Sequence, residues 1–194
     1  MVFTQTEKHW LVGIARRSIQ AVLAGGSPLD RMIDEARISP VLTQKKAVCV
    51  SLYQNDELRG CTGYLMSLVP LWRAVQENAR NAAFRDPRFQ PLRYDELPHV
   101  EVVIHVISHT VPVSAEEEFD PGAEGLLLRK GSRTALFLPR PWITGTLTRC
   151  EIISRLCREA VLGPEGFSGA EDKKIVFIDA IIRDESRTEA QSPR

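Results

Sequence analysis

Two predicted β-hairpins constrain the fold of this 194-residue chain more than any other feature. Residues 47–53 (AVCVSLY) are rich in strand-forming side chains, a short polar turn follows, and strand character resumes at Leu58. A second pair of strand-like runs, residues 125–129 and 134–138, is joined by the turn sequence KGSR. Tight turns of this length connect antiparallel strands, whereas parallel strands need a long crossover. The chain is therefore expected to form a largely antiparallel sheet.

Helical patterns are interspersed among these strands. Apolar residues recur at helical spacing over residues 6–24 and 70–84. Thr4 followed by Glu7 has the form of a capping box at the start of the first helix, and Thr148-x-x-Glu151 has that form at the start of a third helix. Further strands are expected at residues 99–109 and 174–182. Because no regular βαβ repeat appears, we expect an α+β fold in which helices flank a largely antiparallel sheet.

The remaining segments and the composition complete this picture. Residues 27–46 contain proline breakers, and we interpret them as a connection with a short helix near residues 29–37. With 25 basic and 25 acidic residues, the chain has no net charge to attract nucleic acid or an anionic membrane. It shows neither a signal peptide nor a run of apolar residues long enough to span a bilayer. We therefore expect a soluble cytoplasmic protein whose four cysteines are reduced.

The sequence LRGCTGYL (residues 58–65) carries the clearest chemical signal. It sets Cys61 between two glycines, where other groups can approach the backbone closely. Simple alternation along a strand places Arg59 on the same face as Cys61, and a neighbouring cation lowers a thiol pKa. A bulge at Gly60 would undo that arrangement. Cys61 is thus a candidate nucleophile, and the alternative is a buried structural thiol.

A nucleophilic cysteine needs a proton acceptor, and two residues are candidates. His105 lies in the middle of a predicted strand, although a core histidine is the simpler interpretation. Glu101 lies on the same strand, where it is either a partly buried carboxylate of raised pKa or a salt-bridge partner. We expect no metal site, because His105 and His109 would lie about 13 Å apart on an extended strand. The basic hairpin at residues 129–140 is best interpreted as a solvated turn rather than a nucleic-acid site.

The order of the motifs along the chain resembles the AMMECR-type domain family, whose bacterial members are called AmmeMemoRadiSam system protein A. The resemblance extends over about residues 8–183. It rests on the following series: LRGCTGYL, the alanine-rich helix that begins after Pro70, Asp86-Pro87-Arg88-Phe89, Glu96-Leu97-Pro98, Gly122-x-x-Gly125-Leu126-Leu127-Leu128, and Ala135-Leu136-Phe137-Leu138-Pro139.

This resemblance implies a single domain over residues 1–194 with a two-lobed α+β fold. We expect the smaller subdomain to include about residues 25–46 and the tail at about residues 185–194 to be disordered. It also implies a modification pathway shared with a radical SAM protein and a Memo-like protein. We expect this chain to hold no cofactor.

Within that pathway we expect Cys61 to act on a small molecule or a modified base. Arg59 would stabilise an anion or the thiolate, and Glu101 or His105 would transfer protons. Substrate-binding residues would be Gly60, Gly63, Asp86 and Arg88. The alternative is a non-catalytic adaptor that binds the radical SAM or Memo-like partner.

Overall fold

The computed structural model describes residues 2–26, 38–66, 68–115, 118–142, 147–162 and 166–184. The mixture of helices with antiparallel strands confirms the expected α+β fold. The helices of the described residues are α1 (Gln5–Leu23), α2 (Pro40–Thr43), α3 (Leu71–Phe84) and α4 (Arg149–Glu159), with short 3-10 helices at Leu97–His99 and Gly166–Gly169. The strands are β1 (Ala47–Gln54), β2 (Glu57–Tyr64), β3 (Glu101–Pro112), β4 (Glu124–Lys130), β5 (Arg133–Phe137) and β6 (Asp172–Arg183). They pair in the order β2-β1-β3-β6-β4-β5.

The chain divides into two compact units. The first contains Met1–Ile107 and Asp179–Arg194, and the second contains Ser108–Ile178. Residues 38–46 belong to the first unit, whereas the helix predicted near residues 29–37 and the tail at 185–194 lie outside the described residues. No helix of the described residues is both long and apolar enough to cross a membrane.

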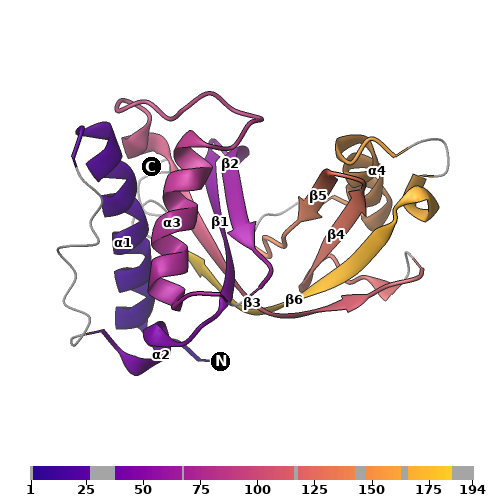
Figure 1. Cartoon of the computed structure of the whole chain (residues 1–194), viewed down its shortest axis with the longest axis horizontal. Coiled ribbons are helices and arrows are strands. Elements are labelled where there is room, and N and C mark those ends of the chain that lie inside the picture. Colours follow the sequence, from indigo (N-terminus) through magenta and orange to yellow (C-terminus); the bar gives the residue numbers. More distant parts are fainter. Residues whose placement is uncertain are drawn as a thin grey trace, which may run out of the picture. The chain divides into compact units, whose positions relative to one another are not determined.

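In the first unit, α1 and α3 lie next to one another, and α3 packs against β1 and β2 (Figure 1). The capping box predicted at the start of α1 is present, with Thr4 and Glu7 each bonding to the other's backbone amide. Alternate residues of the strands face the helices and form the core with them. These strand residues are Val48, Val50, Leu52, Val102, Ile104 and Val106.

Helix α3 is largely buried, because it contacts α1 on one side and the β1–β2 hairpin on the other. Its predicted stripe of small and apolar residues is buried as expected: Leu71, Val75, Ala79, Ala82 and Ala83. Small side chains near its C-terminal end let the helix backbone come close to the sheet. This close contact determines where the residues after the helix are placed.

The second unit contains the hairpin of β4 and β5, which was predicted from its turn, together with α4. Helix α4 begins with the predicted capping box between Thr148 and Glu151. A separate apolar core that includes Phe119 stabilises this unit, and the partly buried Phe137 packs against it. The rings of Phe119 and Phe137 meet edge to face with centroids 5.7 Å apart.

Candidate functional site

Cys61 lies on β2, which pairs only with β1 among the described strands. Its Cα partner on β1 is Ser51, and the Ser51 hydroxyl donates a hydrogen bond to the Cys61 sulfur at 3.4 Å. Cys61 as a residue is partly exposed, whereas Ser51 is buried. Ser51 was not among the predicted site residues, because identifying it requires the pairing of β1 with β2. Its signal in the sequence is that it is the one serine or threonine in the strand AVCVSLYQ.

The backbone amide of Cys61 points away from β1 and donates to Oδ2 of Asp86 at 2.8 Å. Asp86 directly follows Arg85, the residue that ends α3. Its side chain is only 3% exposed, so the carboxylate needs several donors to be stable there. It obtains them from Arg88, whose Nη2 lies 2.7 Å from Oδ2 and whose Nε and backbone amide both reach Oδ1. Asp86 and Arg88, both predicted to bind substrate, are thereby linked to Cys61 through the Asp86 carboxylate.

The surroundings of the thiol raise its pKa. Burial is the main cause, and the Asp86 carboxylate adds to it, while hydrogen bonds from Ser51 and Arg88 act in the opposite direction without cancelling it. Burial also tends to raise the pKa of Asp86, but the donors from Arg88 and Cys61 outweigh it and bring that pKa below its usual value. At neutral pH the site therefore holds a protonated thiol beside an ionised carboxylate.

Arg59 does not share the environment of the sulfur. Leu52 pairs with Gly60 and Tyr53 with Leu58, so Arg59 is the extra residue of an irregularity in the ladder. This breaks the simple alternation on which the prediction for Arg59 rested. The guanidinium instead forms two hydrogen bonds with the Glu96 carboxylate, at 2.9 and 3.0 Å, and a third with the Gln90 carbonyl. The arginine that acts on the Cys61 thiol is Arg88.

The two glycines that flank Cys61 are required by packing. A Cβ atom at Gly60 would lie 2.1 Å from the carbonyl oxygen of Ala82 in α3. A Cβ atom at Gly63 would lie 2.2 Å from the sulfur of Cys49 and 2.7 Å from the Val48 carbonyl oxygen. Gly60 lets α3 approach β2, and Gly63 makes room for the Cys49 side chain. Because Asp86 accepts the Cys61 amide hydrogen, that amide has no vacant position for an anionic substrate.

Neither predicted proton-transfer residue lies directly opposite Cys61. The register aligns Cys61 with Ser51 and then Val103, whereas His105 lies two rows further along the ladder, opposite Cys49. His105 is fully buried. Glu101 is opposite Tyr53, and its carboxylate forms an ion pair with Arg183. The structure thus brings Cys61, Asp86 and Arg88 together and gives Arg59 and Glu101 ion-pair partners elsewhere.

Two further observations concern metals and disulfides. Over the described ranges, no three histidine, cysteine or carboxylate side chains are grouped so that they could hold a metal ion. No disulfide joins the four cysteines, of which Cys150 is exposed and Cys49 is buried.

Comparisons with known proteins agree with the predicted resemblance. The pattern of the AMMECR1 family matches residues 12–177. A protein of Methanopyrus kandleri is 32% identical over 192 residues, covering 94% of this chain and 90% of that protein. A protein of Methanothermobacter thermautotrophicus is 31% identical over 188 residues, covering 94% and 96% of the two chains. A crystal structure of a Pyrococcus horikoshii protein superimposes with a TM-score of 0.76 at 27% identity, covering 94% of each chain. This chain belongs to the AMMECR1 family.

Proposed function

We propose that this protein is a non-catalytic binding component of a modification pathway that also contains a radical SAM protein and a Memo-like protein. The supporting observation is that the residues of the LRGCTG segment are engaged within the protein. The Cys61 amide donates a hydrogen bond to Asp86, and the Arg59 guanidinium donates to Glu96. Neighbouring atoms fill the space that a side chain at Gly60 or Gly63 would need. The segment holds the end of α3, the residues after it and β2 in one arrangement. We place the protein in the cytoplasm, where its thiols stay reduced.

The protonation states around Cys61 support the same proposal. A nucleophilic cysteine reacts as the thiolate, and activated thiols have lowered pKa values. Here burial raises the pKa of the Cys61 thiol, and the adjacent carboxylate is already ionised, with its pKa held below the usual value. Proton transfer from the thiol to Asp86 is therefore unfavourable. Cys61 serves as a packed neutral group whose amide holds Asp86 in place.

The second candidate function is Cys-dependent catalysis on a small molecule or a modified base. It is favoured by the partial exposure of Cys61 and by Arg88, whose side chain is 45% exposed beside the site. An anionic substrate that drew Arg88 away from Asp86 would change the charges next to the sulfur, and with them the thiol pKa. This candidate requires that substrate binding change the environment of the thiol, because the resting environment raises its pKa and slows its reaction.

Replacing Cys61 by alanine separates the two functions. The radical SAM and Memo-like proteins of the same genome would be passed over the immobilised wild-type protein, Cys61→Ala and the matched control Cys150→Ala, which alters an exposed thiol. Each variant would also be returned to a strain that lacks the gene, and the pathway product measured by mass spectrometry. If the protein is a binding component, all three proteins should retain the partners and all three should restore the full amount of product. Retained binding with loss of product in Cys61→Ala alone would establish catalysis instead, and the absence of partner retention by the wild type would refute the binding role.

Alkylation of the thiol gives an independent measurement. The rate at which iodoacetamide labels Cys61 would be followed by mass spectrometry between pH 6 and about pH 11, with free N-acetylcysteine as the reference. We expect the midpoint of the Cys61 rate profile to lie above that of the reference. A midpoint below the reference would show an activated thiol and favour the enzyme.

A further inference from the structure

A pocket of about 650 Å³ lies in the first unit, and its lining does not include Cys61, Asp86 or Arg88. Its walls come from three elements: Val22 in α1, Tyr64 at the end of β2, and one face of α3 with the residue that follows it. The α3 face contributes Glu77, Arg80, Asn81 and Phe84, and Arg85 follows. These positions recur at helical spacing, which explains why they share one face. The volume is in the range of pockets that hold small organic ligands.

The two arginines of this pocket differ from the other arginines around them. Several arginines in the same unit form ion pairs with carboxylates, for example Arg16 with Asp184 and Arg59 with Glu96. In contrast, the side chains of Arg80 and Arg85 form no hydrogen bond or ion pair with any other described residue. Glu77 lies one helical turn before Arg80, a spacing that allows an ion pair, but none is formed. Both guanidinium groups therefore keep their donors available to a ligand.

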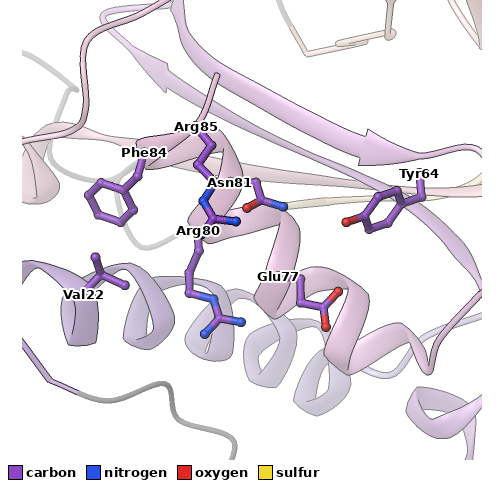
Figure 2. Close-up of a pocket in the computed structure, with 7 residues that line it drawn as sticks. All are labelled: Val22, Tyr64, Glu77, Arg80, Asn81, Phe84 and Arg85. Carbon is purple, nitrogen blue, oxygen red and sulfur yellow. The ribbon is translucent and has the colours of Figure 1, made fainter. Parts of the chain in front are cut away.

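The rest of the lining is suited to a flat apolar group. Figure 2 shows Phe84 and Val22 towards one end of the pocket and Tyr64 towards the other, with the two arginine side chains between them in this view. Val22 and Tyr64 are 41% and 37% exposed, so both can be reached by a ligand. Aromatic rings stack on planar ligands, and guanidinium groups bind phosphate or carboxylate through paired hydrogen bonds. Asn81 and Glu77 add groups that hydrogen-bond with hydroxyl or amino substituents.

We propose that this pocket binds an aromatic oxyanion of about the size of a mononucleotide. Arg80 and Arg85 hold its phosphate or carboxylate in the middle of the pocket, and Phe84, at one end, contacts its ring. The net charge of the lining is positive, because it contains two guanidinium groups and one carboxylate, that of Glu77. Nothing in this site involves Cys61, so its test is independent of the proposed pathway role.

The test uses the whole protein and isothermal titration calorimetry at low salt. The ligands are AMP, phenyl phosphate, adenosine and inorganic phosphate, which separate the contributions of ring and charge. The variants are Arg80→Ala, Arg85→Ala and Glu77→Gln. Arg73→Ala is the matched control, because Arg73 lies on the same helix, contacts Trp72 and does not line the pocket. Circular dichroism confirms that each variant is folded.

We expect AMP and phenyl phosphate to bind the wild type at least tenfold more tightly than adenosine or phosphate. Each pocket arginine variant should weaken AMP binding about tenfold or more, as loss of a charged hydrogen bond implies. Glu77→Gln should strengthen AMP binding, since it removes the one negative charge, and Arg73→Ala and Cys61→Ala should leave it unchanged. No binding of AMP or phenyl phosphate at millimolar concentration would overturn the assignment. So would adenosine or phosphate binding as tightly as AMP, or equal losses in Arg73→Ala and the pocket variants.

Discussion

Replacing Gly60 by alanine is predicted to destabilise the first unit strongly, because the space for a Cβ atom is already filled. That atom would lie 2.1 Å from the Ala82 carbonyl oxygen and 3.0 Å from its carbonyl carbon. Both are backbone atoms, so no side-chain rotation relieves the clash, and α3 or β2 must move by roughly 1 Å or more to reach an ordinary contact distance. Overpacking of a well-packed interior costs about 1–3 kcal/mol and occasionally more. We expect a loss of about 3 kcal/mol in the free energy of unfolding.

A matched glycine substitution provides the control. Gly13 lies within α1, and a Cβ atom there would meet only the end of the Arg17 side chain, at 3.9 Å. Gly13→Ala should stabilise the protein by about 0.5–1 kcal/mol, since alanine is the better helix former. The two substitutions add the same methyl group, and we predict that they change the free energy of unfolding in opposite directions.

Urea unfolding followed by tryptophan fluorescence measures both effects. Trp10 in α1 and Trp72 in α3 report mainly on the first unit. Hydrogen exchange supplies a second measurement, because displacing α3 from β2 should weaken the bond between the Cys61 amide and Asp86 and speed exchange of that amide. A cost below about 0.5 kcal/mol for Gly60→Ala, with unchanged exchange, would show that the close approach of helix and strand does not explain this glycine.

Three further predictions follow from the hydrogen bonds and pKa shifts. Asp86→Asn should lower the free energy of unfolding by about 1.5–3 kcal/mol at neutral pH, because it weakens the bonds to Arg88. The wild-type carboxylate contributes stability above its unfolded-state pKa, near 3.8, and loses it as the pH falls through the lower folded pKa, so the difference should shrink on acidification; a difference that is constant with pH in urea unfolding contradicts this. Ser51→Ala removes a hydrogen bond that lowers the pKa of the Cys61 thiol, so the midpoint of the alkylation profile should move to still higher pH, and an unmoved midpoint would show that the hydroxyl does not act on the sulfur. Thr148→Ala removes the capping box of α4 and should cost about 1 kcal/mol in thermal or urea unfolding, whereas no measurable change would show that this cap is dispensable.

Much of the fold was predictable because its signals are local. The capping boxes at Thr4 and Thr148 depend on side chains three residues apart, and both are present where the sequence predicts them. The two hairpins follow from turn residues between strand-forming runs, and the buried stripe of α3 follows from helical spacing. The family also could be identified from the order of short motifs, and the comparisons confirm it.

The chemistry around Cys61 depended instead on contacts between residues distant in the sequence. One extra residue in β2 turns Arg59 away from the sulfur, and nothing in the local sequence reveals that irregularity. The buried partners of Cys61 come from β1 and from the segment after α3, and their effect on the thiol pKa arises only when the three are assembled. Periodicity determines which residues form a helix or strand, because it reflects the geometry of one element. Which side chain meets which, and in what state of ionisation, is decided by register and burial, and these exist only once the elements have packed together.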